Sequence, residues 1–208
     1  VKRDKINSDN EMKTAIDLYV DSAVKSLLTK SNTPALSIGI IYQGKTYRYN
    51  YGETRIGNNH PPDSKTIYEI GSISKPMAAT IVARLIDEKK LSLDDEVNKY
   101  LPDSIPSLEY GGKKLLVRHL ITHTSDLPTL PEKLYGARLS EDPNNPMKYL
   151  EINHVLAYLK DRGITDTPGV KFRYSNLAYA VLGYICERIT GKGISRLYKE
   201  YLFDPLGM

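Results

Sequence analysis

Cysteine is nearly absent from this chain of 208 residues, since Cys186 is the only one. No internal disulfide can form, so cysteine usage gives no information about the redox compartment. Cys186 lies at helical spacing from other apolar residues in YAVLGYICERI, which predicts a buried structural thiol. Long apolar runs are also lacking, and the longest is far too short to cross a bilayer. The sequence therefore predicts no membrane-spanning helix.

The chain also lacks a block of charge of one sign. Its formal net charge is +4, and its basic residues are spread along the sequence. The 16 tyrosines could serve as stacking platforms for bases, but no cluster of lysine and arginine accompanies them. We therefore expect no nucleic-acid partner. Hydrophobic residues make up 40% of the chain, which is ordinary for a globular protein with a real core.

Hydrophobic periodicity divides the chain into two regions. Residues 1–70 are predicted to form a helix within Glu11–Thr29 and then two strands, Ala35–Tyr42 and Lys45–Gly52, joined by a turn. Residues 71–208 are predicted to be mostly helical, with helices near Ile73–Glu88, Leu115–Thr122, Tyr149–Arg162, Leu177–Thr190 and Ile194–Leu202. A long proline-rich loop covers residues 124–146, and loops of that length are often functional.

A serine and a lysine stand one helical turn apart in YEIGSISKPMAAT, which covers Tyr68–Thr80. If Ser72 is the cap or the first residue of the following helix, Lys75 lies one turn away on the same face, and its amine can reach the serine hydroxyl. A serine hydroxyl is a weak nucleophile until a neighbour accepts its proton, and a lysine with a lowered pKa can do so. Pro76 then falls in the first helical turn, where proline is tolerated. The spacing predicts a nucleophilic serine.

Ser-x-x-Lys is a weak pattern by itself, because the chain contains a second match. Ser22 and Lys25 lie in the middle of the first predicted helix, where they are expected to face solvent. Ser72 differs in its context: Gly71 precedes it, a strand-like piece leads in and a helix leads out. This context singles out Ser72 and Lys75.

A second polar group, Tyr174, Ser175 and Asn176, stands directly before a strong helical pattern. Asparagine is a common helix cap and tyrosine a common core residue, so a purely structural interpretation is open. The functional interpretation assigns Tyr174 a part in proton transfer and Asn176 a hydrogen bond to a substrate. The two interpretations are compatible with each other.

Four motifs together resemble the serine β-lactamase and penicillin-binding-protein superfamily: EIGSISKPMAAT, KKLSLDDEVNKYLP, VRHLITHTSDLP and PGVKFRYSNLAYAVLGYICERITGK. The resemblance runs from about Pro34 to the end and is nearest to class C β-lactamases and their esterase, D-alanyl-D-alanine carboxypeptidase and D-aminopeptidase relatives. It implies an α+β fold, in which an antiparallel sheet is flanked by helices and accompanied by a helical lobe. Residues 1–70 would supply the first helix and strands, and residues 71–208 the helical region with both motifs.

The resemblance also implies roles for individual residues. Ser72 would be acylated, its backbone N–H would form half of the oxyanion hole, and Lys75 would accept its proton or tune the site. Tyr174 would pass the proton to the leaving group, while Asn176 would bind the substrate amide and hold Lys75. The implied activity is that of a serine hydrolase acting through an acyl-enzyme on a β-lactam, a D-amino-acid peptide or a small ester. No cofactor is implied.

Two departures from the family pattern stand out. The third family motif, Lys-Thr-Gly or His-x-Gly on a later strand, does not occur in the sequence. The chain therefore resembles an amino-terminal fragment without the later strands and last helix, and we expect it to be inactive alone because one oxyanion donor is missing. Asp126 stands where relatives usually have glycine, and aspartate can adopt a left-handed backbone there at modest cost.

The sequence also bears on metal binding, on a non-catalytic role and on the border of the site. His119 and His123 are four apart, but no third ligand is evident, so no metal site is expected. A non-catalytic penicillin-binding or sensor module with the same fold is the alternative to an enzyme. The loop Pro128–Pro146 is expected to border the site, and relatives usually act outside the cytoplasm, in the periplasm or on the cell surface. Substrate choice and oligomeric state do not follow from the sequence.

Overall fold

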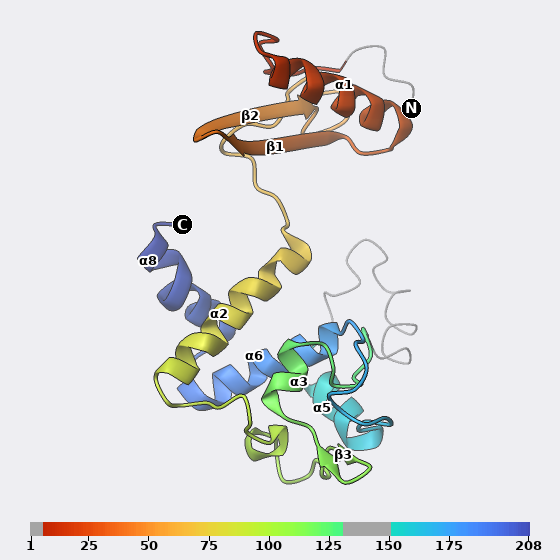
Figure 1. Cartoon of the computed structure of the whole chain (residues 1–208), viewed down its shortest axis with the longest axis vertical. Helices are drawn as coiled ribbons and strands as arrows, with labels where there is room; N and C mark the ends of the chain where they lie inside the picture. Colours follow the sequence, from red (N-terminus) through yellow and green to blue (C-terminus); the bar gives the residue numbers. More distant parts are fainter. Residues whose placement is uncertain (1–5, 131–150) are drawn as a thin grey trace. The chain divides into compact units, whose positions relative to one another are not determined.

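The computed structural model describes residues 6–130 and 151–208, and the chain divides into two compact units, Val1–Glu69 and Ile70–Met208. The first unit holds one helix and a two-stranded sheet, and the second is mostly helical (Figure 1). Within the described residues, every helix is too short or too polar to cross a membrane.

The first unit consists of helix α1 (Ala15–Lys30) and the antiparallel strands β1 (Ala35–Tyr42) and β2 (Lys45–Gly52), as the sequence predicted. Helix α1 begins later than its apolar stripe because Thr14 caps it: the Thr14 side chain accepts from Asp17 N, and Asp17 accepts back from Thr14 N. The two turn residues between the strands, Gln43 and Gly44, both have positive φ, as a tight hairpin requires.

A small core joins α1 to one face of the hairpin. Its buried side chains are Val24 and Leu28 from the helix and Tyr49 and Tyr51 from β2. The Tyr49 hydroxyl donates to Asp17 Oδ1 at 2.6 Å, and this bond lowers the pKa of Asp17 to about 2. Asp17, the partner of Thr14 in the cap of α1, is thereby bonded to β2, which fixes the helix on the hairpin.

The second unit contains short helices and one very small sheet. Its elements are η1 (Gly71–Ile73), α2 (Ser74–Asp87), η2 (Val97–Tyr100), β3 (Glu109–Tyr110), β4 (Lys113–Lys114), α3 (Val117–Ile121), α5 (Ile152–Asp161), α6 (Asn176–Thr190), α7 (Ile194–Tyr198), the π-helical turn η3 (Lys199–Phe203) and α8 (Asp204–Leu206). The β3–β4 hairpin was not predicted, because two-residue strands carry no readable periodicity.

Helix α6 is central to the second unit and packs against α2, α3 and α5 (Figure 1). Its apolar stripe includes Leu182 and Ile185, which are buried together with Ile81 and Leu85 of α2. Each such side chain contributes about 1.5–3 kcal/mol when removed from water. Cys186, on the same helix, is 2% exposed, and burial raises the pKa of its thiol to about 12. The prediction of a buried structural thiol is confirmed.

The predicted helices of this unit are present with small changes at their ends. Helix α5 begins at Ile152, while the first residues predicted for it, Tyr149 and Leu150, lie outside the described residues. The helix predicted over Ile194–Leu202 is divided into α7 and η3. The strand-like piece at residues 66–70 is not a strand and joins no sheet.

Residues 163–175, which we call the return segment, run back along the residues that follow α3 without forming a strand. Three backbone bonds attach this segment and the first residue of α6, with N–H groups of Gly169, Arg173 and Asn176 donating to carbonyl oxygens of Thr124, His123 and Thr129. The return segment is therefore paired irregularly with the loop that follows α3.

Asp126 adds side-chain bonds to this pairing. Its φ is +63°, which agrees with the left-handed backbone considered for this position. Its Oδ2 accepts from Thr165 N at 2.7 Å and Asp166 N at 2.9 Å, and its Oδ1 lies 3.6 Å from an Arg173 guanidinium nitrogen. A glycine would suit the backbone but could not make these contacts.

We predict that Asp126→Gly destabilises the protein by about 1–3 kcal/mol, because hydrogen bonds to a charged group outweigh the modest relief of left-handed strain. Urea unfolding measures this free energy. Asp126→Asn, which tolerates the same backbone and keeps one oxygen acceptor, should lose less. Equal or greater stability of Asp126→Gly would contradict the prediction.

Candidate active site

Ser72 lies in a 3-10 turn, Gly71–Ile73, that leads directly into α2. Of the two positions expected for Ser72, the cap is wrong, because no side chain caps either helical piece; Ser72 lies instead within the 3-10 turn that precedes α2, which begins at Ser74. The hydroxyl of Ser74, and not that of Ser72, bonds back to the turn by donating to Gly71 O at 2.7 Å. The Ser72 hydroxyl is thus left for other partners.

Lys75 reaches two of the predicted site residues from the first turn of α2. Its Nζ donates to Ser72 Oγ at 3.1 Å and to Asn176 Oδ1 at 2.6 Å. Pro76 follows in the same first turn, where the missing N–H leaves the helix intact. The lysine amine therefore lies between the serine of the preceding 3-10 turn and an asparagine 101 positions after the lysine.

Tyr174 and Asn176 stand on either side of the residue that caps α6. Ser175 is the cap, since its hydroxyl accepts from Ala178 N at 2.9 Å. The alternative that Asn176 is the cap is therefore wrong, and its side chain is free to meet Lys75. The Tyr174 hydroxyl donates to Ser72 Oγ at 2.6 Å. The two neighbours of the cap therefore contact the same pair: Tyr174 bonds to Ser72, and Asn176 bonds to Lys75.

The charge of Lys75 acts directly on the tyrosine. Lys75 Nζ lies 4.8 Å from the centre of the Tyr174 ring. The Lys75 ammonium, and then the Ser72 hydroxyl, lower the pKa of the Tyr174 phenol below its usual value. A phenol that loses its proton more readily, at 2.6 Å from a serine hydroxyl, can serve as a proton acceptor for that hydroxyl.

A hollow of about 370 Å³ lies next to these groups. Its lining includes Ser72, Lys75 and Asn176, and its apolar part comes from α2, α6 and α7, with Ala78, Tyr179, Gly183, Ile194 and Tyr198. The Tyr174 side chain is 37% exposed, so the phenol is reachable from solvent. A small molecule can therefore approach the serine.

The second Ser-x-x-Lys match has no such surroundings. Ser22 is exposed on α1, and Lys25 forms an ion pair with Asp21 at 2.8 Å. The interpretation of this pair as a solvated helix face is confirmed. The same four-residue pattern thus occurs twice, and only Ser72 and Lys75 meet a tyrosine and an asparagine from elsewhere in the chain.

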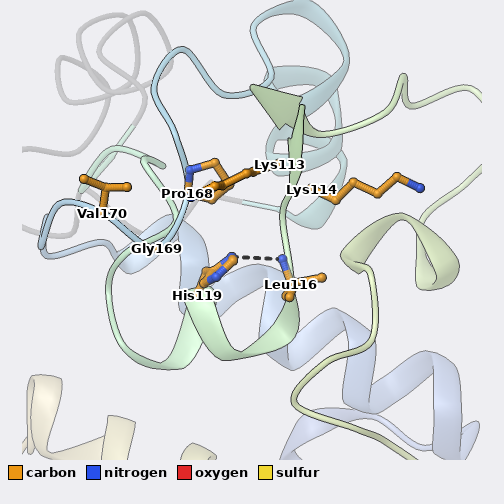
Figure 2. Close-up of a pocket in the computed structure, with 7 residues that line it drawn as sticks. All are labelled: Lys113, Lys114, Leu116, His119, Pro168, Gly169 and Val170. Carbon is orange, nitrogen blue, oxygen red and sulfur yellow. Dashed lines mark hydrogen bonds between the residues drawn. The ribbon is translucent and has the colours of Figure 1, made fainter. Parts of the chain in front are cut away.

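The two histidines of HLITH face different partners. His119 Nδ1 accepts from Leu116 N, and its ring lies beside Gly169 and Val170 in a second hollow (Figure 2). His123 Nδ1 accepts instead from Ser175 N. Within the described ranges 6–130 and 151–208, no three His, Cys, Asp or Glu side chains gather as metal ligands would.

Two contacts of the site were missed by sequence reasoning. His123 lies against Tyr174 with ring centroids 4.6 Å apart, and Thr129 Oγ1 donates to Tyr174 O at 2.8 Å. Both follow α3 in HTSDLPT, a stretch that was noted without a role for these side chains. The remainder of the loop predicted to border the site, residues 131–146, lies outside the described residues.

Comparisons with known protein families and structures show what the chain is similar to. The beta-lactamase family model matches residues 20–208. The D-alanyl-D-alanine-carboxypeptidase/endopeptidase AmpH of Escherichia coli K12 is 29% identical over 93% of this chain and 48% of its own length. Esterase EstB of Burkholderia gladioli is 32% identical over 71% of this chain and 38% of its own length.

The fold of the chain is also similar to that of solved structures. The octameric penicillin-binding protein homologue from Pyrococcus abyssi superposes with a TM-score of 0.78 at 29% identity, covering 94% of this chain and 44% of that one. The α+β, β-lactamase-like fold predicted from the motifs is thus confirmed. The chain spans about half the length of the curated relatives it matches. With a family match over residues 20–208 and the same fold, the chain belongs to the beta-lactamase family.

Proposed function

We propose that the protein is a serine hydrolase that works through an acyl-enzyme, with Ser72 as nucleophile. The observation that carries this proposal is the convergence on Ser72 Oγ of Lys75 Nζ at 3.1 Å and Tyr174 OH at 2.6 Å. A hydroxyl in contact with an amine and a phenol of lowered pKa has the activation that an isolated serine lacks.

In the proposed acylation step, Tyr174 in its phenolate form accepts the proton of Ser72 while Ser72 Oγ attacks the substrate carbonyl carbon. The carbonyl oxygen becomes negative, and the backbone N–H of Ser72 is one of its donors. The intermediate then expels the amine or alkoxide, which takes the proton from Tyr174. The Lys75 ammonium stabilises the phenolate throughout, because it lies over the ring and bonds to Ser72.

Asn176 has two parts in this proposal. Its Oδ1 holds the Lys75 ammonium, and its amide nitrogen remains as a donor for a substrate carbonyl. Hydrolysis of the acyl-enzyme repeats the first step with water in place of the serine, so that Tyr174 accepts a proton from water and returns it to Ser72.

The substrate class is a β-lactam, a D-amino-acid peptide or a small ester. The names of the two relatives, a carboxypeptidase/endopeptidase and an esterase, support acyl transfer as the common chemistry. An extracytoplasmic location and a small-molecule or peptide substrate belong to the same proposal. The alternative, a penicillin-binding or sensor module, shares the acylation step and differs only in slow or absent deacylation.

We predict that fluorescent penicillin or an activated ester acylates the full-length protein at Ser72, and that Ser72→Ala abolishes both labelling and turnover. Ser22→Ala is the matched control, because it removes the other serine of the same pattern, and it should change neither. Rapid turnover supports an enzyme, and a stable adduct supports a sensor. Undiminished labelling of Ser72→Ala would overturn the proposal.

A second prediction concerns the 208-residue chain by itself, whose sequence lacks the third family motif. We expect its rate with an activated ester to be at least about 10²–10³-fold below that of the full-length protein. The reason is that the strand with the third motif would supply the second oxyanion donor, and loss of one such donor lowers the rate by about this factor. The comparison uses equal concentrations of folded protein. Steady turnover by the short chain that disappears with Ser72→Ala would contradict this expectation.

A third prediction concerns pH. Because Lys75 lowers the pKa of Tyr174, Lys75→Met should raise that pKa and move the acid limb of kcat/KM to higher pH. The rate at pH 7 should fall by about 10²–10⁴-fold, with partial recovery at alkaline pH. Lys25→Met, from the second match, should leave the profile unchanged. An acid limb that stays in place in Lys75→Met would contradict the assigned role.

A further inference from the structure

His123 is enclosed by aromatic rings at the back of the site. Its ring centroid lies 4.6 Å from that of Tyr174 and 5.1 Å from that of Tyr179, with the rings tilted at interplanar angles of 34° and 35°. Phe172 meets it edge-on at 5.8 Å. The catalytic candidate Tyr174 therefore rests on the histidine ring.

The backbone on both sides of Tyr174 is bonded to the same histidine. Arg173 N donates to the His123 carbonyl oxygen at 2.7 Å, and Ser175 N donates to His123 Nδ1 at 3.1 Å. One residue thus accepts both flanking N–H groups and packs against the ring between them. His123 therefore restrains Tyr174 through the ring contact and through the backbone on both sides of it.

The arrangement requires a neutral imidazole. Nδ1 can accept from Ser175 N only without a proton, so the proton is on Nε2. Burial, and then the charge of Lys75, lower the pKa of His123 below its ordinary value. The titratable groups that face it are Tyr174, Tyr179 and Lys75, and Lys75 Nζ also lies 5.5 Å from the Tyr179 ring. A second cation beside that ammonium is disfavoured.

The backbone conformation of His123 limits which residues can replace it. Its φ is +58°, shortly after helix α3, and this left-handed conformation is uncommon for residues other than glycine, although His, Asn and Asp are enriched in it. Asparagine carries an oxygen at the position of Nδ1 and no ring, whereas phenylalanine has a ring and no acceptor. These two substitutions separate the hydrogen bond from the stacking.

We propose that His123 is a positioning residue for Tyr174, holding the phenol oxygen at Ser72 through ring packing and the two backbone bonds. The proposal rests on the proposed function, in which Tyr174 moves the proton of Ser72. In this proposal His123 acts through Tyr174 and takes no part in the reaction itself. Its effect is therefore expected on the chemical step, since a displacement of about 1 Å in a catalytic group can reduce the rate about 10²-fold.

The test uses full-length protein and an activated ester, with kcat and KM measured for His123→Asn and His123→Phe. We expect kcat to fall about 10–100-fold in each, with KM within about threefold of wild type. His119→Asn is the matched control, because His119 also accepts a backbone N–H through Nδ1 but faces the hollow at Gly169 and Val170 (Figure 2). Its kcat should stay within about threefold of wild type.

A double-mutant cycle distinguishes positioning from a general structural role. If His123 acts through Tyr174, then His123→Asn made in the Tyr174→Phe background should lower the rate no further, within about threefold. Circular dichroism and thermal unfolding establish the folded fraction of each variant. His123→Asn is the conservative choice for folding because it suits the backbone, and His123→Phe supplies the second measurement.

The outcomes separate this inference from the proposed function. Wild-type activity in Ser72→Ala and Tyr174→Phe would overturn the proposed function itself. Loss of activity in those two variants, with kcat of folded His123→Asn and His123→Phe unchanged, would overturn the positioning role alone. A further loss of tenfold or more in the double variant, or an equal loss in His119→Asn, would also overturn it.

Discussion

The packing of helix α6 against helix α2 is the constraint on which the site depends. Lys75 leaves the first turn of α2 and Asn176 the first residue of α6, and the 2.6 Å bond between them exists only because the helices meet there. Buried side chains of both helices, Leu85 and Ile185 among them, fix this meeting point. The apolar core thereby determines where a polar reaction can occur.

A second constraint acts on Tyr174, which belongs to no helix or strand. Its position comes from irregular pairing between the return segment and the residues after α3, in which Thr129 Oγ1 bonds to the Tyr174 carbonyl and His123 bonds to both neighbours. Such a segment has no ladder of repeated bonds, so individual side chains carry the precision that a sheet would supply elsewhere. Asp126 stabilises the same pairing near the start of the return segment, where its carboxylate accepts from Thr165 N and Asp166 N.

Electrostatics links these parts. The Lys75 ammonium is shared by Ser72 and Asn176 and lies near the rings of Tyr174 and Tyr179. It lowers the pKa of Tyr174 and adds to the effect of burial on His123. One cation thus lowers the pKa of both the Tyr174 phenol and the His123 imidazole.

The sequence alone determined the local elements and the residue types of the site. The periodicity of α1, β1, β2, α2 and α6, and the spacings Ser72–Lys75 and Tyr174–Asn176, are short-range features that a linear pattern records. The tertiary structure alone decided that these two pairs meet and that His123 packs on Tyr174. The physical reason is that such contacts join residues more than 50 positions apart, and only the burial of apolar side chains across the whole unit brings them together.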